Sequence, residues 1–141
     1  MNLAEIVLSL HINSLKPMRR VAGHHKMSLS QLVCVCAIPV VGIKQADLAV
    51  RLCLDISTLS RNIDRLIKKQ LVSKRTSRMD KRSFVISLSP KGEIARLDIF
   101  SSMKEYFKGL ENRLPLNDQE RLVGLLSGLG WTLEKLHSPN G

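Results

Sequence analysis

The sequence predicts a mainly α-helical fold that carries one small β-hairpin, and three observations support this prediction. Apolar residues between positions 56 and 67 recur at the spacing of a helix with one buried face. Between positions 84 and 88 every second residue is large and apolar, which is the spacing of a β-strand. Leucines at helical spacing fill residues 122–136, so the chain is expected to end in a helix.

The central helix is predicted over residues 56–69. Its apolar stripe comprises Ile56, Leu59, Ile63, Leu66 and Ile67. Asp55 precedes the stripe and is expected to cap the helix, because its carboxylate can accept a hydrogen bond from a free backbone N–H. A shorter helix is predicted over residues 43–52, where the small side chain of Ala49 lets another helix approach closely. Residues 53–55 then form the turn between the two helices.

A β-hairpin is predicted after this helix pair. Phe84, Ile86 and Leu88 mark one face of a strand, and residues 72–75 are long enough to form its partner. The polar and cationic residues 76–82 are expected to form the tip of the hairpin. Two helices joined by a short turn and followed by such a hairpin make a winged helix-turn-helix.

Two helices are expected before this module. The first begins with an apolar face and is expected to be interrupted near Pro17. That face comprises Leu3, Ile6, Val7 and Leu10. The second is predicted over residues 29–38, with Ser28 or Ser30 as its first capping residue.

Two more helices are expected after the hairpin. A long helix should run from Pro90 to about Arg113, where residues 114–116, with a proline at their centre, break it. The last helix is expected to start at Asn117, with Glu120 three residues on as the second half of a capped start. It carries Trp131 and the leucines Leu122, Leu125, Leu126, Leu129, Leu133 and Leu136.

The net charge of the chain is strongly positive. Lys and Arg number 22 against 12 Asp and Glu, which gives +10, and residues 51–91 alone contribute +8 of this. Such a concentration of charge on one module is typical of proteins that bind a polyanion. A solvated basic surface is the alternative explanation, but here the charge coincides with the helix-turn-helix.

Composition limits the remaining classes of function. Aromatic residues are 4% of the chain, which disfavours binding of single-stranded nucleic acid by base stacking. The longest apolar run, residues 32–41, contains Pro39 and is too short to span a bilayer, and the N-terminus lacks the basic start of a secretory signal. Three cysteines without a disulfide framework suit a reducing compartment. We therefore expect a cytoplasmic location and no membrane partner.

Two short motifs resemble one known family. The first is Ser57-Thr58-Leu59-Ser60-Arg61, and the second runs from Asp80-Lys81-Arg82 through the strand to Leu88-Ser89-Pro90-Lys91-Gly92. Together, over about a third of the chain, they resemble the MarR family of bacterial and archaeal transcription regulators. The resemblance implies a homodimer that binds double-stranded DNA at an inverted-repeat operator. It also implies a repressor that a small-molecule effector or a redox signal releases.

The resemblance also implies how the chain is divided. A chain of this length can bury one good core, so residues 1–141 are expected to form a single domain. Residues 43–92 would be its DNA-binding lobe. Residues 1–27 and 93–141 would be dimerisation helices. The leucine-rich last helix is more apolar than a monomer of this size needs, although an intramolecular core is the alternative use of these leucines. A helix-turn-helix reader usually needs two half-sites for affinity, which favours the dimer.

The face of the central helix opposite its apolar stripe is the candidate DNA-reading surface. Its candidates for contacts to base edges or nearby phosphates are Ser57, Thr58, Ser60 and Arg61. Among these, Arg61 is the candidate for a bidentate contact to guanine. The candidates for phosphate contacts are Lys44, Gln45, Arg65 and Lys68. The hairpin tip would reach the neighbouring minor groove through Arg78, Lys81 and Arg82. Arg82 could instead brace the hairpin through Asp80, and the sequence leaves both roles open.

The cysteines and histidines show no recognisable metal or catalytic pattern. Cys34 and Cys36 lie two positions apart in an apolar stretch, so they point to different faces and are expected to be core residues. Cys53 lies in the turn before the central helix and is the candidate redox-active thiol. The oxidant-sensing branch of the family uses a cysteine in the first helix, and this chain has none there. The histidines and Cys34 lack the ligand spacing of a zinc site, so we predict no metal and no cofactor.

No enzyme is predicted, because the sequence has no glycine-rich phosphate loop, no paired carboxylates in an apolar setting and no nucleophile with an assigned base. Two other functions stay open. A winged helix can serve for protein or RNA contact, and a chain with an activated cysteine can be a small thiol-dependent enzyme. An inverted-repeat DNA site would favour the regulator over the first alternative. DNA binding that survives alkylation of all three thiols would exclude the second.

Overall fold

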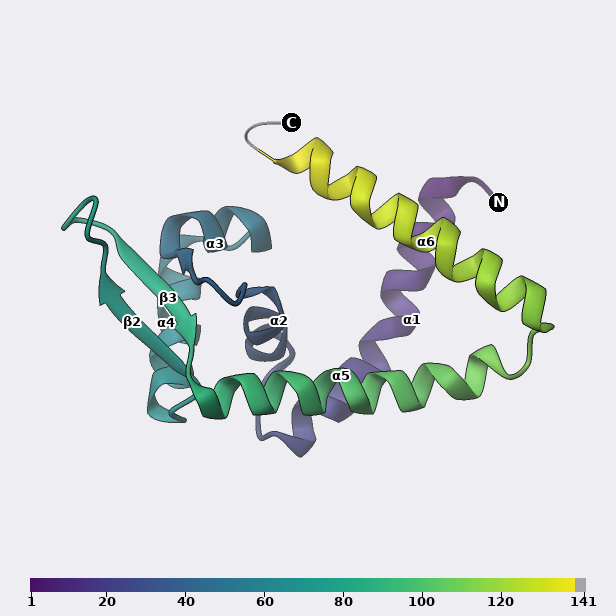
Figure 1. Ribbon diagram of the computed structural model, residues 1–141, viewed down its shortest axis with the longest axis horizontal. Coiled ribbons are helices and arrows are strands. Elements are labelled where there is room, and N and C mark those ends of the chain that lie inside the picture. Colours follow the sequence, from purple (N-terminus) through teal and green to yellow (C-terminus); the bar gives the residue numbers. More distant parts are fainter. Residues whose placement is uncertain (139–141) are drawn as a thin grey trace. The chain divides into compact units, whose positions relative to one another are not determined.

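The computed structural model describes residues 1–138, and the chain divides into two compact units, Met1–Met103 and a second that begins at Lys104 (Figure 1). The described elements are, in chain order, α1 (Leu3–His24), α2 (Leu29–Ala37), β1 (Ile43–Lys44), α3 (Gln45–Leu52), α4 (Ile56–Lys68), β2 (Val72–Thr76), β3 (Phe84–Leu88), α5 (Pro90–Glu111) and α6 (Leu116–His137). The predicted mainly helical winged fold is confirmed. That residues 1–141 act as a single domain stays a prediction.

The core of the first unit lies where α2, α3 and α4 pack together and against the sheet. Its fully buried aliphatic side chains include Val35, Ile38, Leu48, Leu59, Ile63, Leu66 and Ile86. Burying each such side chain stabilises the fold by roughly 1.5–3 kcal/mol. Ala49 is 3% exposed, and its small side chain lies in the same core, as the close approach of helices at this position predicts.

The hairpin belongs to a three-stranded antiparallel sheet with the order β1-β3-β2. Strands β2 and β3 pair along their whole length, as predicted. Strand β1 lies on the other side of β3, where Ile43 pairs with Ile86 and Lys44 with Val85. The prediction of a helix over residues 43–52 was therefore wrong at its first two residues. A two-residue strand is too short to show an alternating pattern. Only its pairing with β3, which lies far along the chain, identifies it.

Helix α4 confirms the predicted central helix to within one residue. Its buried face is narrower than predicted and comprises Leu59, Asn62, Ile63 and Leu66. Ile56 and Ile67, which were predicted to complete that face, are 56% and 37% exposed. The elements that pack against α4 are α2, α3 and β2, and they cover only the middle of the apolar stripe.

Helix α1 continues through Pro17 to His24, so the predicted interruption was wrong. Proline lacks the N–H that would bond the preceding turn, but its fixed φ is compatible with a helix. Here the proline ring is buried together with Val21 and Ala22, and this packing offsets the missing hydrogen bond. Helix α2 starts at the first of its two predicted caps: the hydroxyl of Ser28 accepts the N–H of Gln31 at 3.1 Å in a capping box.

Helix α6 starts at Leu116, so the predicted start with Asn117 as the cap was wrong. Pro115 occupies the capping position in extended conformation, and its carbonyl oxygen accepts the N–H groups of Asp118 at 2.9 Å and Gln119 at 3.1 Å. Asn117 is already inside the first turn of the helix, one residue too late to cap it. The side-chain amide of Gln119 donates instead to the carbonyl of Leu114 at 2.8 Å.

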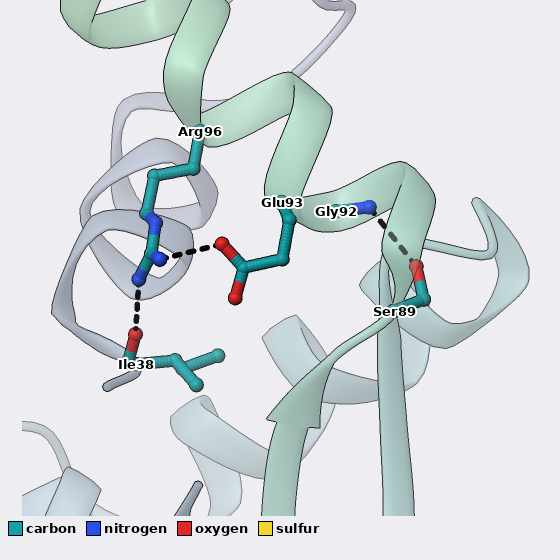
Figure 2. Close-up of polar contacts among 5 residues, drawn as sticks. All are labelled: Ile38, Ser89, Gly92, Glu93 and Arg96. Atoms are coloured by element: carbon teal, nitrogen blue, oxygen red, sulfur yellow. Dashed lines mark hydrogen bonds and ion pairs between the residues drawn. The ribbon is translucent and has the colours of Figure 1, made fainter. Parts of the chain in front are cut away.

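Helix α5 begins against the turn between α4 and β2. The hydroxyl of Ser89 donates to the carbonyl of Gln70 at 2.6 Å. The same hydroxyl accepts the N–H of Gly92 at 3.0 Å (Figure 2). The N–H of Ser89 donates to the carbonyl of Leu71 at 2.9 Å. A Cβ atom on Gly92 would lie only 2.0 Å from that same carbonyl oxygen, so this contact requires a glycine.

A second contact joins the start of α5 to the end of α2. The guanidinium of Arg96 donates to the carbonyl of Ile38 at 2.8 Å and forms an ion pair with Glu93 one turn before it (Figure 2). The side chain of Arg96 is 14% exposed, so these partners satisfy a largely buried cation. The two contacts fix the first turns of α5 on the lobe.

We predict that Gly92→Ala destabilises the protein by about 1–3 kcal/mol, because backbone must move to accommodate the new methyl group. The matched control is Gly109→Ala in the same helix, where nothing lies within 4 Å of an added Cβ. That change should be neutral or stabilising by up to about 1 kcal/mol, since alanine favours a helix. Urea denaturation measures both, and equal effects of the two substitutions would contradict the close-contact argument.

Candidate nucleic-acid interface

The turn between α3 and α4 sets where the outer face of α4 begins. Cys53 ends α3 in the left-handed conformation, with φ 52°. The carboxylate of Asp55 then accepts the N–H of Thr58 at 2.6 Å and the hydroxyl of Ser57 at 2.7 Å. These hydrogen bonds lower the pKa of Asp55 to about 2, and the bond from the backbone N–H of Thr58 has the largest effect. The predicted cap is therefore confirmed.

The outer face of α4 presents the predicted reading residues to solvent. Ser57, Arg61, Arg65 and Lys68 are exposed, and Thr58 and Ser60 are half-buried. The guanidinium of Arg61 lies 3.3 Å from the hydroxyl of Thr58 and can donate to it, so Thr58 can help to orient Arg61. The face is thus cationic, with hydroxyl groups at its N-terminal end.

Polar contacts hold α4 from behind. The side-chain amide of Asn62, 5% exposed, donates to the hydroxyl of Ser30 at the start of α2 at 2.7 Å. At the other end of the helix, the ammonium of Lys69 donates to the carbonyl of Lys26. Sequence analysis missed both residues. In the sequence, Asn62 places an amide within the apolar stripe. That position could have predicted a side-chain hydrogen bond on the buried face of the helix.

Two residues at the start of α3 were predicted to contact phosphates, and they differ in exposure. Lys44 is exposed, whereas Gln45 is only 8% exposed. Little of the Gln45 side chain is accessible, and its proposed phosphate contact stays a prediction. The low exposure arises because β1 takes residues 43 and 44, which starts α3 at Gln45 and turns that residue inward.

The wing tip is held by Asp80. Its carboxylate accepts the backbone N–H of Arg82 at 2.9 Å, and its carbonyl accepts the hydroxyl of Ser83 at 3.1 Å. The brace between Asp80 and Arg82 thus uses the backbone of Arg82 rather than its guanidinium. Within residues 1–138 the guanidinium forms no ion pair, so it stays available for another partner.

The structure adds two wing cations that sequence analysis did not select as site residues. Arg75 on β2 is exposed, and the ammonium of Lys74 lies 4.2 Å from the centre of the Phe84 ring. Their place in a predicted strand beside the hairpin tip was the available signal. The exposed cations of this surface are Lys44, Arg61, Arg65, Lys68, Arg75, Arg78, Lys81 and Arg82. We call this set the cationic surface, and in the described part of the chain none of its members pairs with a carboxylate.

The cysteines are all free. Burial raises the pKa of Cys34 to about 11, despite a hydrogen bond with Asn62, and burial also raises the pKa of Cys36, against the effect of the Arg96 charge. The expected core position is confirmed for Cys34, whereas Cys36 is half-buried and packs against the core. Cys53 is exposed, so it is the accessible thiol of the three, and its redox role stays a prediction.

Among residues 1–138, no three His, Cys, Asp or Glu side chains gather where they could hold a metal ion. None of the helices in that described part combines the length and the apolarity that crossing a bilayer requires.

Comparison with known proteins agrees with this geometry. Residues 27–84 match the model of the MarR family, and this segment contains α2, α3, α4 and the start of the wing. The chain therefore contains a segment similar to the MarR family. A MarR transcriptional regulator from Methanosarcina mazei Go1 shares the fold with a TM-score of 0.80 at 18% identity, covering 95% of this chain and 97% of that one. The chain has no match among curated proteins.

Solved structures of MarR-family proteins share the fold along nearly the whole chain. Wild-type MarR from E. coli in its apo form superposes with a TM-score of 0.81 at 19% identity, covering 92% of this chain and 96% of that one. The multiple antibiotic-resistance repressor from Listeria monocytogenes 4b F2365 gives 0.66 at 26% identity, covering 94% and 93%. NadR in complex with 4-hydroxyphenylacetate gives 0.73 at 19% identity, covering 92% of each chain.

We predict that Asp55→Ala lowers the melting temperature at pH 7, because the N–H of Thr58 loses its acceptor, whereas Asp55→Asn keeps most of the stability. The folded pKa is lowered, so the carboxylate contributes fully above the unfolded pKa of about 3.9. Its contribution is lost as the pH falls toward a folded pKa of about 2. Melting curves at pH 7, 4 and 3 should show the deficit of Asp55→Ala shrinking. A deficit that grows on acidification would contradict the assignment.

Proposed function

We propose that the chain is a homodimeric, sequence-specific DNA-binding repressor that reads an inverted-repeat operator. The observation that carries this proposal is the cationic surface. Its members project from α4, β1 and the wing, the elements that a winged helix brings to the grooves and backbone of a duplex. Eight exposed cations without carboxylate partners favour phosphate binding through release of condensed counterions.

Within this proposal the predicted residues take distinct roles. Helix α4 enters the major groove, where Arg61 donates to guanine and the hydroxyl groups of Ser57, Thr58 and Ser60 contact base edges or phosphates. Lys44, Arg65 and Lys68 hold phosphates. The wing enters the neighbouring minor groove with Arg78, Lys81 and Arg82, and the backbone brace at Asp80 supports a direct role for the Arg82 side chain.

The proposed dimer uses the terminal helices, 1–27 and 93–141. None of the described residues of α6 is buried, even though many of them are leucines. The side chains of Leu122, Leu125, Leu126 and Leu133 are each 40% exposed or more. The N-terminal part of α1 likewise exposes Leu3, Ile6, Val7 and Leu10. Apolar surface of this extent favours a protein partner. A second copy of the chain is the partner that a reader of two half-sites needs.

Repression and its release are proposed from the family. The Listeria relative is a repressor by name, and NadR was solved with a small organic acid. We therefore propose that a small-molecule or redox signal changes the spacing of the two α4 helices in a cytoplasmic bacterial or archaeal dimer. If the protein served RNA or protein contact instead, a pool of random duplexes would yield no inverted repeat, and this selection is the direct test of the proposed function.

We predict that Arg61→Ala and Lys68→Ala differ in their effect on specificity. On the duplex selected by the protein, Arg61→Ala should cost roughly 1–3 kcal/mol of binding, and it should cost much less on random DNA. Lys68→Ala should weaken both complexes about equally and reduce the salt dependence of binding by about one phosphate per subunit. Fluorescence anisotropy at several salt concentrations measures both effects. Equal losses on both duplexes for Arg61→Ala would make it a phosphate contact.

We predict that Leu126→Glu shifts the dimer toward monomer and weakens operator binding, because a charge would then lie in an apolar interface. The control is Ser127→Glu, which adds the same charge on the opposite side of α6, away from the leucine stripe. Sedimentation at micromolar concentration distinguishes the species. A monomeric wild-type protein, or dimers unaffected by Leu126→Glu, would count against this interface.

A further inference from the structure

A shallow cavity of about 480 Å³ lies in the first unit, away from the cationic surface. Three segments form its walls: the α1–α2 turn, the α4–β2 turn and the first turns of α5. Its volume is within the range of sites for small organic ligands. Neither the reading face of α4 nor the wing contributes a lining residue, so the cavity is independent of the DNA contacts proposed above.

The charges around this cavity complement an anion. Lys26, Lys69 and Lys91 line it, one from each wall. The acid among the lining residues is Asp98, and it already pairs with His25 at 2.9 Å. The ammonium of Lys69 is held in place, because it donates to the carbonyl of Lys26. With three lysines and one carboxylate among the lining residues, the cavity carries an excess of positive charge.

The surface between these lysines is aliphatic. Met27 and Leu71 are 7% and 5% exposed and form its floor, while Ile94 on α5 is 69% exposed and forms one wall. The imidazole of His25 lines the cavity but pairs with Asp98, and no Phe, Tyr or Trp ring is among the lining residues. Flexible aliphatic side chains, methionine among them, adapt to a bent hydrocarbon chain, whereas flat ligands gain most from stacking on aromatic rings.

We infer that this cavity binds an aliphatic carboxylate of medium chain length. The carboxylate contacts Lys91 and Lys26 at the rim, and the hydrocarbon chain lies on Met27, Leu71 and Ile94. The ligand would join the end of α4 to the start of α5. A resulting effect on operator affinity rests on the proposed function, but binding itself does not.

Calorimetry with the full-length protein tests the site, with decanoate as the probe. Decanoate should bind at one site per chain. Decanol, which lacks the charge, and decyltrimethylammonium, which reverses it, should bind at least about tenfold more weakly. Benzoate should also bind more weakly, because it lacks the chain. Equal affinity for decanoate and decanol would overturn the role of the lysines, and tighter binding of benzoate would overturn the aliphatic specificity.

Variants locate the binding site. Lys91→Gln should weaken decanoate binding about tenfold, and Ile94→Asp should weaken it at least as much by placing a charge on the apolar wall. Both side chains are exposed, so neither change threatens the fold. The control Lys16→Gln removes an exposed lysine of α1 outside the cavity and should leave decanoate affinity unchanged. Unchanged binding in both cavity variants would overturn the proposed site.

Two readouts separate this inference from the proposed function. Decanoate binding without any operator binding would support the site and contradict the function, whereas operator binding without decanoate binding would do the reverse. Sedimentation of Ile94→Asp provides a further test. Dissociation of the dimer by this substitution would mean that a second copy covers the cavity, and it would overturn the small-ligand proposal.

Discussion

The contact between Ser89 and the turn at Gln70 and Leu71 organises the first unit. One hydroxyl group serves both sides, because it donates to the end of the α4–β2 turn and accepts from the first turn of α5. The same contact ends β3, positions α5 and closes the hairpin against the core. It tolerates only hydrogen on the Cα of Gly92, since the carbonyl of Leu71 occupies the space of a side chain. The motif Leu88-Ser89-Pro90-Lys91-Gly92 is therefore explained by packing and hydrogen bonding, without any contact to DNA.

The candidate interface combines this rigid support with charge that remains available. Elsewhere in the first unit, the largely buried guanidinium of Arg96 is paired with Glu93 and the carbonyl of Ile38. On the cationic surface the described side chains do not pair with acids. Keeping like charges together costs folding stability through mutual repulsion. That cost is consistent with a surface selected for a polyanionic partner rather than for stability.

Periodicity predicted α4, the hairpin and the outward direction of Arg61, Arg65 and Lys68, because these depend on local geometry alone. It could not predict β1, which exists only through its pairing with β3. The burial of Gln45 followed from that same strand, since it shifted the start of α3. The exposure of Ile56 depends on how far the neighbouring elements reach along α4. The sequence could not show whether Asp80 contacts the backbone or the side chain of Arg82, because the spacing of the two residues is the same in both cases.

The hydrogen bond between Asn62 and Ser30 has a consequence for the accuracy of reading. An apolar stripe holds a helix against its neighbours but lets it roll about its own axis with little change in contact. A directional bond on the buried side removes that freedom. For a helix about 10–12 Å across, a roll of about 20° moves a surface atom by about 2 Å, which is enough to break any hydrogen bond to a base edge. The amide of Asn62 on the inside of α4 thus limits the angular freedom of the side chains on its outside.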